Sequence, residues 1–581
     1  MPRSVCSALP SAWTAPTKGS NAIGTTGSAD LLFVNGAVHV PARRDAPTPR
    51  AVAVRAGRIA AVGTNDDVRA LAGPGTEVVD LAGRMLVPGF QDAHVHPPAG
   101  GLEMLRCNLS DAYSVPEYER LIAGYAAERP DDPWILGGGW SMDVFPGGNP
   151  PKDVLDRVVP DRPVYLPSRD GHSAWVNSRA LEIGGVTAAS ADPADGIIVR
   201  DRDGEPWGTL HEGATDLVAS RIPPDRDEEW IEGLRVAQAY LHSLGITAWQ
   251  DANVGTKDSG YPTFEPYRTF AASGDLTARV VGALWWDRHR GVEQIDDLLD
   301  LRERGAVGRF AATSVKIMQD GVIENFTAGV LEPYLDAEGR PTDNVGKSFV
   351  DPEELKLAVT RLDAESFQVH VHAIGERANR EALDAFETAS AASGPNDLRH
   401  HIAHIQVIHP DDVPRFAELG VVANAQPLWA INEGQMEHLT VPFLGPERST
   451  WQYPFGSLVR GGARVAMGSD WSVSSPNPVW GIHVAVNRMT PADYAYGHEA
   501  DAPFLPHERL DVGTALDAYT INTAYVNHLD ATTGSIEVGK EADLVVLDRD
   551  LLSIPAAELH TATVLLTLVG GERVYATGDL A

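Results

Sequence analysis

The chain has 581 residues, and its 43% hydrophobic and 22% charged residues are typical of a folded globular protein with a large core. Its 47 basic and 80 acidic residues give a net charge of -33, which argues against nucleic acid or an anionic membrane as a partner, because phosphate binding needs a basic surface. The only cysteines, Cys6 and Cys107, exclude a disulfide framework and a cysteine-rich zinc site.

Residues 1–28 are rich in Ser, Thr, Ala, Gly and Pro, and we interpret them as a disordered N-terminal extension. The segment lacks the apolar core of a signal peptide, and no run of 18 apolar residues occurs in the chain. We therefore expect a cytoplasmic protein without a membrane span.

Short β-like runs separated by glycine turns occupy both ends of the ordered chain. They cover residues 31–36, 51–63 and 78–83 near the start, and 534–548 and 564–575 near the end. The same texture at both ends predicts one small β domain assembled from residues 29–87 and 532–581.

The middle of the chain alternates β-like runs with helical patterns, which indicates βα units and a parallel sheet. The eight runs cover residues 85–96, 246–251, 279–285, 314–319, 368–372, 399–404, 421–426 and 464–470. Eight such units predict an α/β fold, a (β/α)8 TIM barrel over residues 88–531, with its active site at the C-terminal ends of the strands. Residues 97–243 are too long for one connection, and we expect them to form an insertion that covers the active site.

His94 and His96 close the first of these runs, in a His-x-His pattern that places both imidazoles on one face of a strand. Two solvated loop histidines are the alternative for this pair alone. Further metal-binding residue types at the ends of four other runs favour a metal site; they are Lys316, His372, His404 and Asp470. A free ammonium at Lys316, between Val315 and Ile317, is unfavourable in a barrel strand, and a carbamate on its amine would make it an anionic bridging ligand.

Several motifs occur together and in order along the chain. They are residues 88–96, residues 171–178, Lys316 with Asp320-Gly321, residues 372–378, His404 with Gln406, Gln426-Pro427, Gly468-Ser469-Asp470, and residues 539–548. On these motifs the chain resembles the amidohydrolase superfamily, in the branch of YtcJ-like proteins and N-substituted formamide deformylases. The resemblance implies that the small domain is a urease-like β-sandwich.

The resemblance also implies the roles of the ligands. His94, His96 and Asp470 would bind one ion, His372 and His404 a second, and a carboxylated Lys316 would bridge the two. Zn²⁺ is the expected metal, although other divalent ions and a single ion beside an unmodified Lys316 remain alternatives. Asp470 would also take a proton from the attacking water and pass it to the leaving nitrogen.

Four residues are candidates for contact with the substrate. His172 lies in a family motif within the insertion, where it would line the pocket and contact the carbonyl oxygen. Gln426 belongs to another motif. Trp140 and Trp429 follow Gly-rich and Gln-Pro segments and suggest a hydrophobic or aryl-bearing substrate, with core packing as the alternative. We expect His370 to lie one layer below the site, packed and hydrogen-bonded.

The leading hypothesis is a metal-dependent amidohydrolase (EC 3.5) that cleaves a non-peptide C–N bond in a small linear amide, such as an N-substituted formamide. A deaminase or a cyclic amidohydrolase on the same scaffold is the alternative within enzymes. A non-catalytic ligand-binding or regulatory protein is the alternative of another class. The oligomeric state is open, with a homodimer among the options.

Overall fold

The computed structural model describes residues 27–41, 48–257, 261–394, 396–494 and 502–580. The N-terminal extension is predicted over residues 1–28, and residues 1–26 of it lie outside the described part of the chain. No helix of the described segments is long and apolar enough to cross a bilayer.

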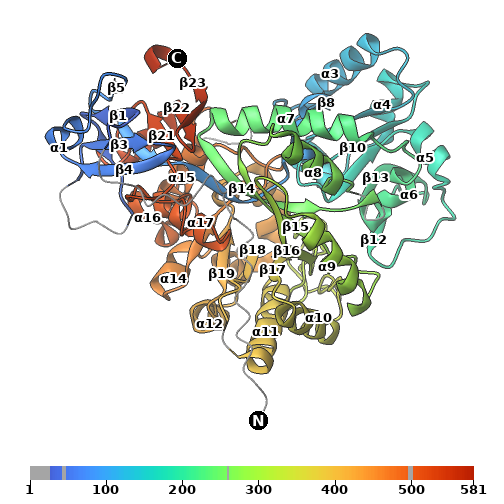
Figure 1. The fold of residues 1–581 in the computed structure, drawn as a ribbon. Coiled ribbons are helices and arrows are strands. Elements are labelled where there is room, and N and C mark those ends of the chain that lie inside the picture. The colour runs from blue at the N-terminus through green and yellow to red at the C-terminus, as the bar shows by residue number, and fades with distance from the viewer. Residues whose placement is uncertain (1–26, 42–47, 258–260, 395, 495–501, 581) are drawn as a thin grey trace.

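Eight parallel strands form the central sheet, and they lie side by side in chain order (Figure 1). Their bounds are Phe90–Val95 (β7), Ile246–Val254 (β14), Arg279–Trp285 (β15), Phe310–Met318 (β16), Gln368–Ala373 (β17), His401–His404 (β18), Val422–Ala425 (β19) and Val465–Met467 (β20). The first and last strands meet, since the backbone N–H of Asp470 donates to the carbonyl oxygen of His94 over 2.7 Å. The predicted (β/α)8 barrel is confirmed.

The first predicted strand, residues 85–96, is divided by a glycine. Met85–Pro88 (β6) pairs with strands of the small β domain, whereas β7 begins the barrel. A Cβ atom at Gly89 would lie 2.3 Å from Oγ1 of Thr247, so only glycine fits where the chain passes from one sheet to the other.

Helices alternate with the barrel strands. They are Asp227–Ser243 (α7), Phe264–Ser273 (α8), Ile295–Arg304 (α9), Pro352–Ala364 (α10), Glu376–Ser393 (α11), Val413–Leu419 (α12), Phe455–Arg460 (α14), Val512–Ala518 (α16) and Ile521–Val526 (α17). Helix α10 shows how the sequence sets a helix start: the carboxylate of Asp351 accepts hydrogen bonds from the backbone N–H groups of Glu353 and Glu354, and Pro352 occupies the first turn. The apolar faces of these helices pack on the sheet, and each fully buried Leu or Phe side chain contributes about 1.5–3 kcal/mol.

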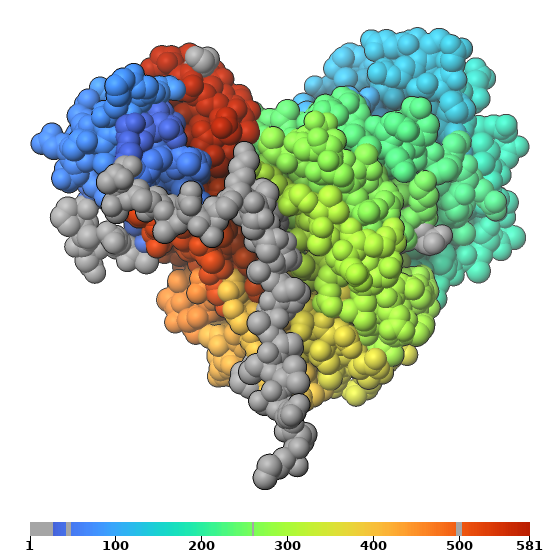
Figure 2. All heavy atoms as spheres, viewed as in Figure 1, coloured from blue at the N-terminus to red at the C-terminus, as the bar shows by residue number. Residues whose placement is uncertain are grey.

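Strands from both ends of the chain build two further sheets. One contains Leu31–Val34 (β1), Ala51–Arg55 (β3), Arg58–Gly63 (β4) and Glu77–Asp80 (β5). The other contains Ala37–Val38 (β2), β6, Leu544–Leu547 (β21), Val564–Val569 (β22) and Glu572–Ala576 (β23). Phe33, Val52, Leu544 and Leu566 share one core between them. Figure 2 shows the blue N-terminal and red C-terminal segments in one lobe.

A third unit is built within the segment after β7. Its sheet has the order β12-β13-β11-β10-β9-β8, with bounds Cys107–Asn108 (β8), Ile135–Gly138 (β9), Val164–Pro167 (β10), Ser173–Val176 (β11), Gly196–Arg200 (β12) and Pro206–Glu212 (β13). Helices Val115–Glu128 (α3), Lys152–Val158 (α4) and Ser178–Gly184 (α5) accompany it. This unit lies on the opposite side of the barrel from the small β domain (Figure 1).

Candidate metal centre and substrate pocket

Three histidines and one aspartate form the centre of the site, at the ends of β7, β18 and β20. Nε2 of His94 and Nε2 of His96 lie 3.3 and 3.0 Å from Oδ1 of Asp470. Nδ1 of His404, at the end of β18, lies 3.9 Å from Oδ2 of Asp470. The ligand atoms of His94, His404 and Asp470 all lie within 4.8 Å of one another, which is close enough for them to share one ion.

The backbone turns these side chains into the centre. Asp470 has a φ of +56° and His404 a φ of +75°, conformations that residues with a Cβ atom rarely adopt. Such conformations are typical of functional sites, where the surrounding structure compensates the strain. His404 is the last residue of β18, and Asp470 lies three residues beyond the end of β20.

Lys316 and His372 complete the set of predicted ligands. Nζ of Lys316 lies 3.4 Å from Nε2 of His94. Burial lowers the pKa of Lys316 to about 7, against the opposing effect of Asp470 and Asp251. The ring of His372 lies 4.5 Å from that of His404, centre to centre. The structure therefore brings together all six residues that the sequence proposed as ligands, from five strands.

The chemistry of this set fits a divalent cation. Burial lowers the pKa of His94 to about 3, and Lys316 adds to the effect, so its imidazole is neutral and offers a lone pair. Burial alone would raise the pKa of Asp470, but the surrounding His94, His96 and His404 hold it well below its usual range, so it is a carboxylate. Within the described segments, Nδ1 of His404 and Oδ1 of Asp470 are buried without a hydrogen-bond partner, and such unsatisfied acceptors are what a metal ion would satisfy.

Two buried carboxylates hold the ends of the strands in place. Asp92 accepts hydrogen bonds from the backbone N–H of His94 over 3.0 Å and from Oγ of Ser469 over 2.6 Å. Asp320 accepts from the N–H groups of Ile374 and Gly375, and its Oδ1 lies 3.2 Å from Nδ1 of His372. Both aspartates lie in motifs that the sequence analysis used only for recognition, without a role for the carboxylates.

His172 reaches the edge of the centre from the insertion. Its ring lies 5.5 Å from that of His372, and its Nδ1 lies 3.0 Å from Oε2 of Glu212. Burial alone would lower the pKa of His172, but the carboxylates of Glu212 and Asp170 outweigh it and raise this pKa to about 9. His172 is thus an imidazolium at neutral pH. The sequence analysis missed Glu212, because no local pattern distinguishes it among 80 acidic residues.

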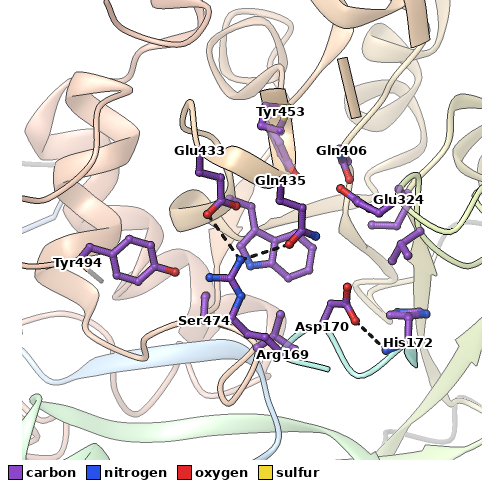
Figure 3. A pocket seen from close by; sticks show the side chains of 15 residues that line it. Arg169, Asp170, His172, Glu324, Gln406, Glu433, Gln435, Tyr453, Ser474 and Tyr494 are labelled. Carbon is purple, nitrogen blue, oxygen red and sulfur yellow. Dashed lines mark hydrogen bonds and ion pairs between the residues drawn. The ribbon is translucent and has the colours of Figure 1, made fainter. Parts of the chain in front are cut away.

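A pocket adjoins the centre beside His172 (Figure 3). Its charged lining residues are Arg169, Asp170, Glu324 and Glu433, and its aromatic ones are Trp429, Tyr453 and Tyr494. Nη2 of Arg169 lies 3.5 Å from Oε2 of Glu433, and both side chains point into the space drawn in Figure 3. The Trp429 indole is stacked on the His404 imidazole at 5.0 Å and 2°. His172 and Trp429, two of the predicted substrate contacts, therefore line this pocket.

The other two predicted contacts lie elsewhere. Trp140 is fully buried in the core of the insertion, with its indole N–H donating to the carbonyl oxygen of Leu166 over 2.7 Å. Gln426 is fully buried too: its Oε1 accepts from the N–H of His404, and its Nε2 donates to Oδ1 of Asn424. Packing and hydrogen bonding occupy both side chains, and neither belongs to the lining of this pocket.

A (β/α)8 barrel that gathers four histidines, a lysine and an aspartate at one end of its strands is the architecture of a metal-dependent hydrolase. The chain matches the model of the Amidohydrolase family over residues 77–575, and it belongs to this family. The resemblance found in the sequence motifs is confirmed.

Two relatives and one solved structure are similar along most of their length. Protein LONG AFTER FAR-RED 3 of Arabidopsis thaliana is 34% identical, with 94% of this chain and 92% of that protein covered. The N-substituted formamide deformylase of Arthrobacter pascens is 28% identical, with 94% and 98% covered. The crystal structure of an uncharacterized metal-dependent hydrolase from Pyrococcus furiosus has a TM-score of 0.65 at 25% identity, covering 90% of this chain and all of that one.

Proposed function

We propose that this protein hydrolyses a C–N bond, other than a peptide bond, in a small linear amide such as an N-substituted formamide. The observation that carries the proposal is the convergence of the six ligand-type side chains beside a pocket into which His172 projects as a cation. Similarity to an N-substituted formamide deformylase across nearly the whole chain supports the choice of bond.

The proposed centre holds Zn²⁺. His94, His96 and Asp470 would bind one ion, and His372 and His404 a second, with Lys316 as a carboxylated bridge in the two-ion form. An ion held there supplies Lewis acidity, which polarises a carbonyl group and makes water a nucleophile near neutral pH.

Three side chains would carry out proton transfer, stabilise the developing charge and orient the catalytic groups. The Asp470 carboxylate takes the proton of the attacking water on an Oδ atom and delivers it to the leaving nitrogen. The His172 imidazolium donates a hydrogen bond to the carbonyl oxygen as negative charge develops there. Glu212 holds His172 in its charged form and in its orientation.

The pocket supports a more specific substrate than the sequence suggested. Its walls combine the rings of Trp429, Tyr453 and Tyr494 with the charged groups of Arg169, Asp170, Glu324 and Glu433. An N-substituent with an aromatic body and a polar end would contact both kinds of wall, stacking on the rings and hydrogen-bonding to the polar groups.

An activity panel with metal analysis tests this proposal. Purified protein would be assayed against N-substituted formamides, acyl amides, cyclic amides and ring amidines, with and without added Zn²⁺. We expect hydrolysis of the linear amides, loss of it with a chelator, and a loss of about 10²–10⁴-fold in kcat for Asp470→Asn. Turnover of cyclic amides or ring amidines alone would instead support the alternative enzyme class. A metal-loaded protein that turns over none of the panel, or an unchanged Asp470→Asn variant, would contradict the proposal.

A further inference from the structure

The ring of His94 is hydrogen-bonded on the side that faces away from Asp470. Its Nδ1 lies 2.9 Å from Nε2 of His370, and Nδ1 of His370 lies 2.7 Å from Oε1 of Gln250. All three side chains are at most 1% exposed. They come from β7, β17 and β14, so this chain of hydrogen bonds crosses the interior of the barrel below the metal centre.

The orientation of the Gln250 amide follows from its neighbour. Nε2 of Gln368 donates to the carbonyl oxygens of Arg399 and Val526, over 3.0 and 2.6 Å. Because backbone carbonyl groups only accept, the Oε1 of Gln368 must face the other way, where Nε2 of Gln250 donates to it over 2.9 Å. Oε1 of Gln250 is thereby left to face His370.

A second route gives the same orientation. Nδ2 of Asn424 donates to the carbonyl oxygen of Ala93 over 2.9 Å and to Nδ1 of His401 over 3.2 Å. His401 then carries its proton on Nε2, which donates to Oε1 of Gln250 over 3.0 Å. Two independent anchors on backbone carbonyl oxygens therefore make Oε1 of Gln250 an acceptor for two imidazoles.

The position of the protons on the remaining rings follows. His370 donates from Nδ1 to an atom that can only accept, and its buried place beside Lys316 and other imidazoles disfavours a second proton. Its Nε2 therefore accepts, and the proton between the two histidines belongs to Nδ1 of His94. Nε2 of His94, which lies 3.3 Å from Asp470 and 3.4 Å from Lys316, is left with a lone pair.

We propose that Gln250 and His370 are positioning residues that hold His94 in the Nδ1–H tautomer, so that Nε2 is ready to bind a metal before the ion arrives. The inference rests on the metal centre of the proposed function. A hydrogen bond to the far nitrogen of a metal-binding imidazole fixes its tautomer and orientation and raises its basicity. Apolar side chains in place of Gln250 and His370 would fill the same space, but they would not determine which ring nitrogen of His94 carries the proton.

Two substitutions of one residue separate hydrogen bonding from packing. His370→Leu removes the acceptor for His94, whereas His370→Gln retains an acceptor oxygen at a similar reach. We expect His370→Leu to weaken Zn²⁺ binding by about 10–100-fold, measured by competition with a chelator at fixed pH, and His370→Gln to weaken it several-fold less. His242→Leu is the matched control, because His242 is a buried histidine bonded to Ile246 and Thr277 outside this network.

A measurement on the metal-free protein tests the tautomer directly. Ring-nitrogen chemical shifts of ¹⁵N-histidine-labelled protein, with His94 assigned by loss of its signals in His94→Gln, should show the proton on Nδ1 in the wild type and a mixture in His370→Leu. A proton on Nε2 of His94 in the wild type, or equal zinc affinity of the Leu and wild-type proteins, would overturn the inference. A wild type that binds no zinc contradicts the proposed function, whereas the tautomer result stands separately.

Discussion

Oε2 of Glu212 and Nδ1 of His172 lie 3.0 Å apart, and this buried pair joins two strands of the insertion at the edge of the metal centre. Oγ1 of Thr327, from the loop after β16, donates to the same carboxylate over 2.8 Å. The pair therefore links the insertion to the barrel and places a cation beside the ring of His372. Its charge state determines how the site responds to pH.

The pKa of His172 is about 9 in the folded protein, above the value of about 6.5 for an unfolded histidine. The stability from this pair is therefore fully present below pH about 6.5 and is lost as the pH rises through about 9.

We also expect kcat/KM to fall above pH about 9, when the imidazolium loses its proton. Glu212→Gln removes the negative charge that raises the pKa of His172 against the effect of burial. The alkaline limb of the pH–rate profile should therefore move to lower pH. An unmoved limb would show that His172 is not the titrating group.

Lys316 should be the site of a carbon dioxide adduct. Its pKa of about 7 leaves a large neutral fraction at pH 7, and a neutral amine is the form that reacts with carbon dioxide. We expect two zinc ions per chain when the protein is prepared with bicarbonate and one in Lys316→Gln, measured by elemental analysis. A wild-type protein that holds one ion whatever the bicarbonate concentration would favour the single-ion alternative with an unmodified lysine.

Arg279 and Asp543 form a buried ion pair between the barrel and the small β domain, with side-chain exposures of 8% and 1%. Asp543→Asn removes the fully buried one of the two carboxylates that face the guanidinium and leaves Glu541, 3.4 Å from its Nη2, so it should lower the free energy of unfolding by about 3 kcal/mol. The exposed pair of Arg340 and Glu338 is the control, and Glu338→Gln should change stability by less than about 1 kcal/mol. Denaturant titration of both variants measures the difference, and equal effects would contradict this reasoning.

Gly468 allows β20 to approach β7 at the centre. A Cβ atom there would lie 2.5 Å from the backbone nitrogen of His94 and 2.8 Å from Oδ1 of Asp92. Gly468→Ala should therefore separate the two strand ends, destabilise the protein by about 1–3 kcal/mol and weaken zinc binding. In Gly124→Ala the new methyl group meets no atom within 4 Å, so that helix position should become slightly more stable. Thermal unfolding and zinc titration of the two variants provide the comparison, and intact zinc affinity in Gly468→Ala would rule out a role in the site.

Much of the metal centre could be predicted from the sequence, because parallel strands run in the same direction and end at the same side of the barrel. Once residues 85–96, 368–372 and 399–404 were assigned as strands of one barrel, their C-terminal histidines had to meet at the same end. The side of a strand on which a residue lies follows from alternation, which is how His94 and His96 could be paired. The expectation that His370 lies below the site, packed and hydrogen-bonded, is confirmed by its contacts with His94 and Gln250.

Other assignments depended on packing. Trp140 and Trp429 follow similar turn-rich segments, yet one fills the core of the insertion and the other stacks on His404. The neighbouring residues do not predict where either side chain lies, because burial depends on which elements pack together in the folded protein. The same holds for Glu212, whose partner His172 lies 40 residues away in the chain.

The sequence by itself determined the alternation of strands and helices, the small β domain built from both ends, and the kinds of side chain that would meet at the ends of the strands. The strands and helices follow from periodicity over a few residues, and the meeting of the strand ends follows from the common direction of parallel strands. Only the tertiary structure decided the hydrogen-bond partners, the charge on His172 and the proton position on His94. Those properties arise from burial and from contacts between strands distant in sequence, and such contacts exist only once the barrel has closed.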